Sequence, residues 1–481
     1  MGKILYMRLK GSQNLRLRLL LSTLSSTPIL IEDIRADATW PGLLSHEVSL
    51  LRLLEKVSDD CHVEINETGT KLKYKPGIVM GGRNLVHDCG VSRSIGYFLE
   101  PLIVLGLFGK KPLTIRLNGI TNDSKDPSVD TFKSATLPML KRFGVPPEGL
   151  ELKIESRGVP PHGGGEIILS IPIVQDSLKA ISWIDEGMVK RIRGISFSTR
   201  VSVQFENTMI HAARGVLNRL LPDVYIFTDH KAGPQAGKSP GYGITLVAET
   251  TSGCFISADT AVSYASGKED GMDDEENKEL NPPEDVGEQI TSILLGEIEQ
   301  GGVVDSTHQG LLFLLCALCP QDVSKVRVGQ LVPHGIEVLR HIRDFLGVKF
   351  VIKPDPSTMT IFPYKYLGQE LFRISLVYVL SNGGKKRLGQ LYGVINLSDS
   401  DIEAKKSDFM MVNLTSEEAT DLQKSKADER KMVAGPSGKV STLGGEGVSP
   451  RTRRVNLKLT SDEMDKVEEW IEYVRDLSSR A

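Results

Sequence analysis

One pattern of helix-forming and strand-forming segments occurs three times along the sequence and constrains the fold more than any other feature. Residues 15–80 predict a helix, a strand, a second helix and two strands, from the spacing of their apolar residues. The same order recurs over residues 92–174 and again over residues 308–362. Three αβαββ units predict a mixed α/β (α+β) fold whose copies pack together, because one unit alone would leave its sheet poorly covered.

The segment between the second and third copies departs from this pattern. Residues 183–266 predict a strand, a helix and two further strands, so we expect a small α/β domain inserted there. The stretch that follows is acidic, bears prolines and has almost no apolar residues, which is typical of a solvated linker. The expected divisions are residues 1–182 for repeats one and two, 183–266 for the inserted domain, 267–287 for the acidic loop, 288–362 for repeat three and 363–481 for a divergent extension.

The divergent extension ends in a second recognisable pattern. Residues 400–455 are rich in Lys, Glu, Ser and Gly and predict a flexible linker. Residues 461–480 begin with a serine suited to an N-cap and carry apolar side chains at helical spacing, including Trp470 and Ile471. We therefore expect a C-terminal amphipathic helix that docks on another surface.

Charge and cysteine usage exclude several classes of protein. A formal net charge of −3 excludes wholesale binding of a polyanion by bulk charge, so any contact with RNA must come from local patches. The apolar run that contains Arg16 and Arg18 is too short and too charged to span a bilayer, and we expect no membrane association.

The five cysteines are scattered, and the CxxC of Cys316 and Cys319 lies in an apolar helix-like run, which favours core packing over zinc. We expect no metal and no cofactor.

Several stretches, taken in order, resemble the RNA 3′-terminal phosphate cyclase superfamily. They are GSQNLR, IRADATWPGLLSHE, RGVPPHGGGEI and GGVVDSTHQGLLFLLCALC, and the resemblance covers roughly residues 3–355. It implies a fold of three such repeats with a small domain inserted after the second. One branch of the superfamily adenylylates a histidine with ATP and cyclises an RNA 3′-phosphate. A cyclase-like branch works in the nucleolus on the small ribosomal subunit precursor, with an assembly GTPase, and is regarded as lacking cyclase activity.

Departures from the cyclase motifs favour the cyclase-like branch. Residues 9–13 read Leu-Lys-Gly-Ser-Gln. The corresponding loop of the cyclases resembles an acidic residue followed by three glycines and Gln, so the carboxylate and two of the glycines are missing here. Residues 35–38 read Arg-Ala-Asp-Ala instead of Arg-Ala-Gly-Arg, which removes one guanidinium and adds a carboxylate. An Asp-Gln pair of the third repeat falls on Gly310 and Leu311. The resemblance therefore implies a pseudoenzyme.

One position favours the active cyclase branch instead. The adenylylated histidine of the cyclases aligns with His334, which follows Pro333 at the start of a predicted helix. The N-terminus of a helix favours anions, so a histidine there is suited to contacting phosphate. A nucleophile also needs ATP held and its leaving group stabilised, and those supporting groups are missing. A phosphate-contacting or helix-capping histidine is our interpretation, and a catalytic His334 is the alternative.

The candidate RNA- or anion-binding residues lie at junctions between predicted strands and helices, where the fold can bring them towards one basic cleft. They are Gln13, Arg16, Arg35, Arg157 and His334. For any single arginine, capping of a carbonyl or pairing with a local carboxylate explains its presence equally well. The predicted helix from residue 334 also presents Arg340 and Arg343, which are candidates for a surface that meets a partner.

These observations lead to one expected function and two alternatives. We expect a non-catalytic factor in small-subunit biogenesis, located in the nucleolus and needed for 18S pre-rRNA processing. The resemblance implies an assembly GTPase, pre-rRNA and the small nucleolar ribonucleoprotein of the small-subunit processome as partners. The first alternative is an active ATP-dependent RNA 3′-phosphate cyclase using His334. The second is a pre-rRNA endonuclease, although no pair of residues has the spacing expected of its acid and base groups.

Overall fold

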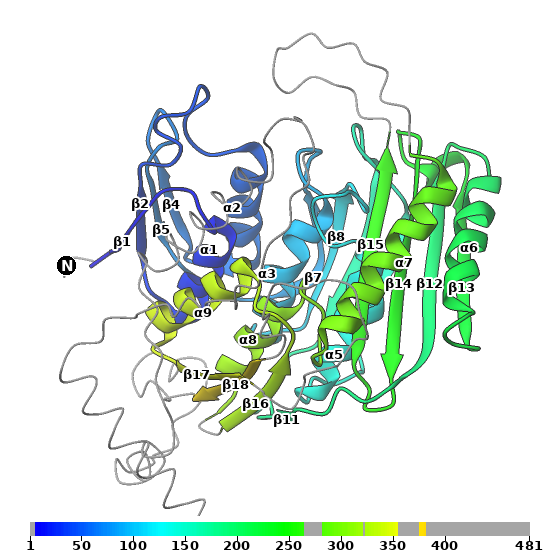
Figure 1. The fold of residues 1–481 in the computed structure, drawn as a ribbon. Helices are drawn as coiled ribbons and strands as arrows, with labels where there is room; N and C mark the ends of the chain where they lie inside the picture. The colour runs from blue at the N-terminus through cyan, green and yellow to red at the C-terminus, as the bar shows by residue number, and fades with distance from the viewer. Residues whose placement is uncertain (1–4, 264–280, 321–322, 355–374, 381–481) are drawn as a thin grey trace, which may run out of the picture. The chain divides into compact units, whose positions relative to one another are not determined.

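Three four-stranded sheets in the computed structural model share one strand order, which confirms the predicted repeats and the mixed α/β class (Figure 1). The structure describes residues 5–263, 281–320, 323–354 and 375–380. In each sheet the first two strands are parallel and the remaining pairs are antiparallel. The orders are β1-β2-β5-β4, β7-β8-β10-β9 and β11-β16-β18-β17.

The first repeat follows the predicted order and adds a strand in front of it. Its strands are β1 (Met7–Lys10), β2 (Ile29–Glu32), β4 (His62–Ile65) and β5 (Leu72–Lys75), and its helices are α1 (Leu15–Ser25) and α2 (Ser45–Val57). A short pair, β3 (Ser58–Asp59) and β6 (Ile78–Val79), lies outside the four-stranded sheet. The leading strand was not predicted because its four residues alternate between partly covered and exposed side chains, which leaves little apolar signal.

The second repeat has the same plan. Its strands are β7 (Gly82–Asp88), β8 (Leu113–Gly119), β9 (Glu151–Ser156) and β10 (Gly165–Ile171). Its helices are α3 (Ile95–Leu107) and a continuous helical segment made of α4 (Val129–Thr131), the π-helical η1 (Phe132–Thr136) and α5 (Leu137–Arg142). The glycine-rich loop before β10 packs closely on β8: Gly163 has φ +59°, and a Cβ there would lie 3.0 Å from the carbonyl oxygen of Gly119.

The third repeat extends beyond its expected end. It contains β11 (Ser182–Trp183), α8 (Gln309–Ala317), β16 (Val323–Val328), α9 (Pro333–Leu346), β17 (Lys349–Pro354) and β18 (Ser375–Leu380). The sequence places the last strand at residues 358–362, which lie outside the described residues, whereas β18 comes from the expected divergent extension. The run SLVYVL suits a strand bonded on both sides, because it is rich in apolar and β-branched residues.

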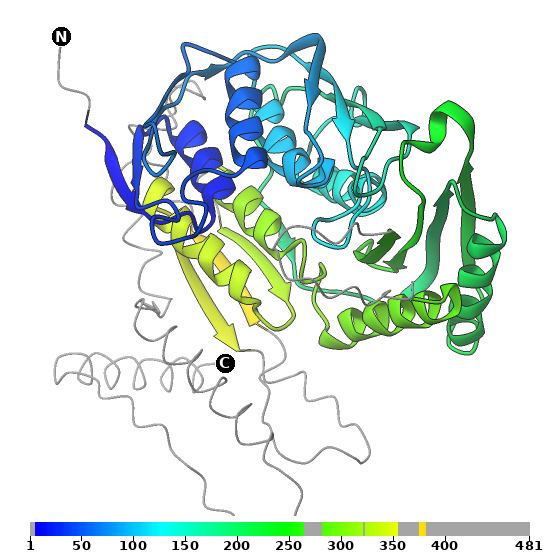
Figure 2. The same ribbon diagram turned by 90° about the horizontal axis from the view of Figure 1, so that it is seen from above.

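The inserted domain is a separate sheet covered by two helices. It contains β12 (Val189–Thr199), α6 (Gln204–Leu217), β13 (Val224–Lys231), the short 3₁₀-helix η2 (Gly233–Ala236), β14 (Gly241–Thr250), β15 (Phe255–Ser263) and α7 (Pro283–Gln300). Strand order is β13-β12-β14-β15. The sequence analysis divides α7 between the acidic loop and repeat three, but Val286, Ile290 and Leu294 pack in the apolar core of the inserted sheet together with α6 (Figure 2).

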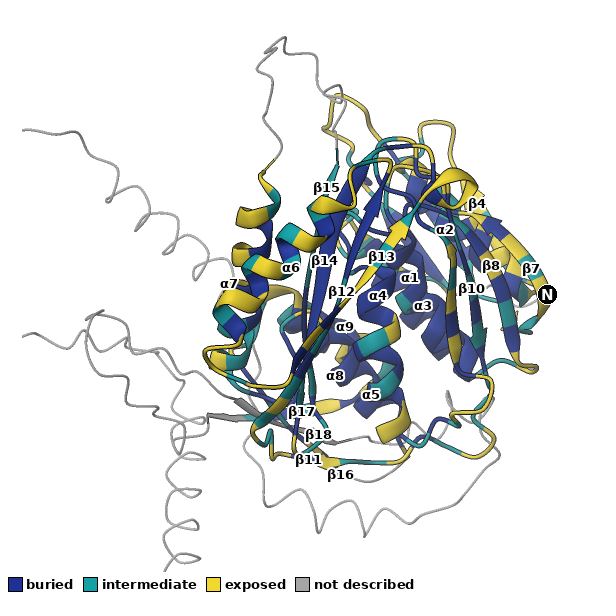
Figure 3. Cartoon of the chain, turned by 90° about the vertical axis from the view of Figure 1, so that its right-hand side faces the viewer, coloured by how far each residue is buried: buried dark blue, intermediate teal, exposed yellow. Residues whose placement is uncertain are grey.

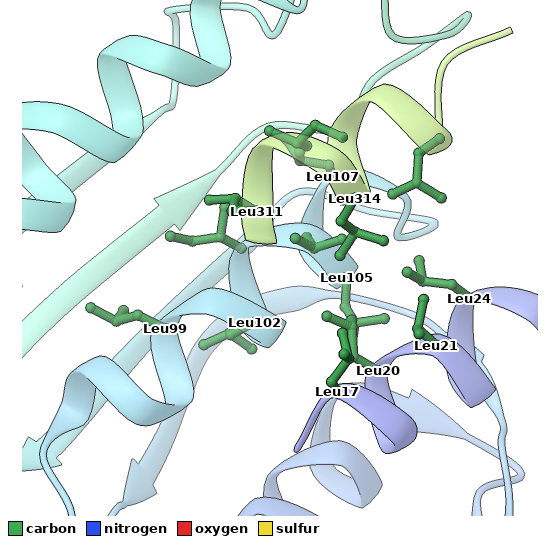
Figure 4. Packing of buried hydrophobic residues seen from close by; sticks show 14 of the residues in the cluster. Leu17, Leu20, Leu21, Leu24, Leu99, Leu102, Leu105, Leu107, Leu311 and Leu314 are labelled. Carbon is green, nitrogen blue, oxygen red and sulfur yellow. The ribbon is translucent and has the colours of Figure 1, made fainter. Parts of the chain in front are cut away.

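The helices of the three repeats share one apolar core. Leucines of α1, α3 and α8, among them Leu20, Leu105 and Leu314, are buried in a single cluster and point towards one another (Figure 4). Cys316 and Cys319 are free thiols within it, as expected. None of the helices described is long and apolar enough to cross a membrane. The predicted linker and C-terminal helix lie outside the described residues.

Candidate functional site

The loops that carry Gln13 and Arg35 lie side by side because they follow parallel neighbouring strands. The carboxyl ends of β1 and β2 meet at one edge of the first sheet, where the backbone N–H of Gly11 donates to the carbonyl oxygen of Glu32 at 2.9 Å. Gln13 is exposed on the first of these loops, and Arg16 lies in the first turn of α1. The repeated topology therefore places these predicted residues at one edge of the molecule.

Arg16 is held against α3 of the second repeat. Its guanidinium pairs with Glu100 at 3.0 Å, donates to the carbonyl oxygen of Tyr97 at 3.1 Å and lies over the Tyr97 ring, 5.0 Å from the centroid. The positive charge is thus matched by a carboxylate in the folded protein, and the side chain ties the first repeat to the second.

His334 lies on α9, which packs against the helix α1 that carries Arg16. It occupies the first turn of α9, and a Cβ at Gly310 of α8 would lie 3.6 Å from its Nε2 atom. Partial burial lowers the pKa of His334, the charge of Arg16 lowers it further, and Glu100 opposes the shift. The net pKa is below the ordinary value of about 6.5, so the imidazole is neutral at neutral pH.

Arg35 is engaged by a carboxylate at the start of α2. Its two terminal nitrogens donate to Glu47 at 2.8 and 2.6 Å, and it also donates to the carbonyl oxygen of Gly42 at 3.0 Å. The Glu47 carboxylate in turn accepts the backbone N–H of Leu44 at 2.8 Å, which is half of a capping box. This bidentate pair fixes the loop before α2 and leaves Arg35 with its charge neutralised.

Two residues of the site were missed by the sequence analysis. Arg93 lies 4.9 Å from the centroid of the Tyr97 ring and pairs with Asp126, whose hydrogen bond is the main reason that the pKa of Arg93 is raised. His46 packs edge-on against Tyr97 at 5.0 Å, and burial lowers its pKa. The repeat contains a signal for Arg93, because it follows β7 as Arg16 follows β1.

Arg157, one of the candidate RNA- or anion-binding residues, does not join this cluster and is instead buried in ion pairs, the alternative that the sequence also allowed. Only 1% of its side chain is exposed, and it pairs with Asp130 at 2.7 Å and with Asp229 of β13 at 2.6 Å. It also donates to the side-chain oxygen of Asn122 at 3.1 Å and lies over the ring of Phe197. Arg157 therefore links the second repeat to the inserted domain and has no surface to offer a ligand.

The two arginines proposed for a partner surface also lie in ion pairs on α9. Arg340 pairs with Glu337 at 2.8 Å and is largely covered, whereas Arg343 is about half exposed and pairs with Asp344 at 3.0 Å. Their role in binding stays a prediction. Within the described ranges, no group of three or more His, Cys, Asp or Glu side chains is arranged to hold a metal ion.

Charge balance is the main chemical property of the site. Each arginine of the site is matched by a carboxylate: Arg16 by Glu100, Arg35 by Glu47 and Arg93 by Asp126. Cations already paired with carboxylates attract an incoming phosphate far less than free cations do, because the ligand must compete with the internal partner. Each of the three guanidinium groups is thus neutralised by a carboxylate, and the pKa of the nearby His334 imidazole is lowered, which is a poor setting for holding a triphosphate.

Comparison with known proteins supplies the family context for this geometry. A family model described as RNA 3′-terminal phosphate cyclase matches residues 7–352. The chain is 65% identical over 372 residues to a probable RNA 3′-terminal phosphate cyclase-like protein of Arabidopsis thaliana, covering 77% of this chain and 99% of that protein. It is 49% identical over 346 residues to the human RNA 3′-terminal phosphate cyclase-like protein, covering 72% and 90% of the two chains. It is 45% identical over 325 residues to the rRNA processing protein rcl1 of Schizosaccharomyces pombe, covering 67% and 85%.

Proposed function

Since the chain belongs to the RNA 3′-terminal phosphate cyclase family, and specifically resembles its cyclase-like members, we propose that it acts in rRNA processing as a non-catalytic factor. The role in rRNA processing is supported by the similarity to a relative of that name in Schizosaccharomyces pombe. In this proposal the protein contacts pre-rRNA in the nucleolus during 18S maturation, together with an assembly GTPase and the small nucleolar ribonucleoprotein of the small-subunit processome.

The observation that carries the non-catalytic part is the internal pairing of the site's arginines. A histidine nucleophile requires cations free to hold the phosphates of ATP and to stabilise its leaving group. Here Arg16, whose charge acts on the aligned His334, is matched by Glu100, and Arg35 is matched by Glu47. The loop at residues 9–13 also keeps a single glycine, Gly11, for close approach of a phosphate.

The first test is direct adenylylation. The purified full-length protein is incubated with radiolabelled ATP and Mg²⁺, with and without an RNA that ends in a 3′-phosphate. We expect neither a covalent AMP adduct nor a cyclised RNA end. An adduct that disappears in His334→Ala, while an adduct remains in the matched His162→Ala variant of an exposed histidine, would establish the active cyclase instead.

The second test concerns the cellular role and uses the same variants. Depletion of the protein is expected to leave unprocessed 18S precursors, and the His334→Ala protein is expected to restore processing to the level of the unchanged protein. Normal small-subunit rRNA maturation after depletion would contradict the proposed role. Failure of His334→Ala to restore processing at normal abundance, together with an AMP adduct that is lost in the same variant, would contradict the non-catalytic part of the proposal.

A further inference from the structure

Strand β13 forms an open edge of the inserted sheet. It pairs with β12 on one side, and no other strand among the described residues lies on its outer side. Figure 3 shows β13 next to β12, and the strand alternates between buried residues such as Val224 and Ile226 and exposed ones such as Tyr225 and Phe227. The edge runs from Val224 to Lys231, which is long enough to receive several residues of an added strand.

The main-chain groups that point away from the sheet can be assigned. The N–H of Ile192 in β12 donates to the carbonyl oxygen of Asp223 at 2.9 Å, so the polar groups of Asp223 face β12. Because these groups alternate in direction along a strand, those of Val224, Ile226 and Thr228 face outwards. Each carries one donor and one acceptor, which an extended chain can satisfy by continuing the ladder.

Exposed aromatic side chains line the same edge. Tyr225 is 53% exposed and Phe227 is 52% exposed, and their rings meet edge to face with centroids 4.5 Å apart. Exposed edge strands usually carry charges or proline that discourage pairing with other chains. Here the two side chains that flank the outward main-chain groups are large and aromatic, which is typical of residues that contribute most to binding at protein interfaces.

The charges nearest the aromatic pair, on β13 and at Arg193 of β12, favour a peptide over RNA. Arg193 pairs with Asp223 at 2.8 Å, and Lys231 pairs with Asp229 at 3.1 Å. Single-stranded RNA stacks on aromatic rings but also needs an excess of positive charge along its backbone. The paired charges supply no such excess, so the surface suits a ligand recognised by main-chain hydrogen bonds and apolar contact.

We propose that β13 binds an extended segment of a partner protein, which adds as a fifth strand and places apolar side chains at alternate positions on Tyr225 and Phe227. The partner's main chain pairs with the outward groups of Val224, Ile226 and Thr228. This inference goes beyond the rRNA role and does not depend on the chemistry of the candidate site. It assigns the inserted domain a function of its own, as the docking edge of the protein.

The test selects a displayed library of random linear peptides against the full-length protein. We expect enriched peptides with apolar residues at every second position, and slower amide exchange at Val224, Ile226 and Thr228 when a synthesised peptide from the selection binds. Thr228→Pro removes an outward N–H without touching the bonds to β12, so it should weaken peptide binding by about tenfold or more. The double variant Tyr225→Ser/Phe227→Ser should do the same.

Trp40→Ala is the matched control, because it removes an aromatic side chain that is 81% exposed elsewhere on the molecule. It should leave peptide binding unchanged. Selected peptides that bind Thr228→Pro as tightly as the unchanged protein would overturn the proposal. So would strong exchange protection of the three amides in the free protein, self-association abolished by Thr228→Pro, or tighter binding of an oligouridine RNA than of any selected peptide.

Discussion

At the scale of single residues, Arg157 shows how a buried charge can join two parts of a chain. Burial opposes its charge, but the carboxylates of Asp130 and Asp229 outweigh that effect and raise the pKa of Arg157 above its usual range. Asp130 is fully buried and belongs to the second repeat, whereas Asp229 belongs to β13 of the inserted domain. Removing the arginine would leave these carboxylates without their cation in a poorly solvated place.

The variant Arg157→Met tests this arrangement. We expect the free energy of unfolding to fall by about 3–5 kcal/mol, the cost of breaking a buried ion pair from one side. Urea denaturation followed by circular dichroism measures the change. Arg83→Met, at an exposed arginine, is the control and should stay within about 0.5 kcal/mol of the unchanged protein. A loss below about 1 kcal/mol for Arg157→Met would contradict a structural role.

The sequence predicts residue positions at this scale better than it predicts their partners. Arg16 and His334 both lie at junctions of a repeated unit, and the helices that carry them, α1 and α9, pack against each other. The burial of Arg157 was not predictable, since its partner Asp229 is 72 residues away in a domain with a different pattern. Pairing across domains leaves no periodic signal in the chain.

At the scale of elements, the start of α2 combines a helix cap with an ion pair. Glu47 accepts the N–H of Leu44 and holds Arg35 with both carboxylate oxygens. The carboxylate also lies at the positive end of the helix, where negative charge is stabilising. The Glu47 side chain therefore fixes the start of the helix and also pairs with Arg35, which makes that arginine less available to a ligand of the candidate site.

Glu47→Ala should remove both interactions at once, and two measurements report their separate consequences. The variant loses charge-assisted hydrogen bonds, so the free energy of unfolding should fall by about 2–3 kcal/mol. It also frees Arg35, so a short single-stranded RNA should bind more tightly in fluorescence anisotropy at low salt. Glu55→Ala, an exposed position on the same helix, removes the same charge and should change neither quantity by as much. Equal effects of both variants would show that general charge, rather than release of Arg35, explains the result.

Elements with a continuous apolar stripe were predicted well, and short elements were not. The helices α1, α2 and α9 lie where the apolar spacing places them. The leading strands β1, β7 and β11 were missed because they are short or partly exposed. Each is stabilised as a strand by hydrogen bonds to a parallel neighbour. Such pairing is tertiary, so it overrides a weak local preference.

At the scale of the whole molecule, a buried polar network joins both apolar cores. Asp305 accepts hydrogen bonds from the backbone and hydroxyl of Ser257 in β15, at 2.8 and 2.7 Å, and pairs with His308 at 2.8 Å. His308 also bonds Thr136 of the second repeat at 2.8 Å. Burial opposes both charges, but mutual attraction leaves the pKa of His308 raised and that of Asp305 lowered. One ion pair thus connects repeat two, the inserted sheet and repeat three.

This pair predicts a pH dependence of stability. A raised pKa for His308 in the folded state means that its contribution is complete below about pH 6.5 and is lost as the pH rises through the folded-state value. The difference in unfolding free energy between the unchanged protein and His308→Gln should therefore narrow as the pH rises above about 6.5. Urea denaturation at each pH measures it, with His162→Gln at an exposed histidine as control. A difference that widens with pH would contradict the assignment.

The junction between β17 and β18 has a consequence for how the chain tolerates changes of length. Pro354 and Ser375 are partners across the two strands, so β17 ends and β18 begins at one point of the third sheet. A chain shortened to end before Ser375 would lose β18, which is bonded to β16 on one side and to β17 on the other. Such a truncation should therefore destabilise the third sheet even though it leaves β11, β16 and β17 in the chain.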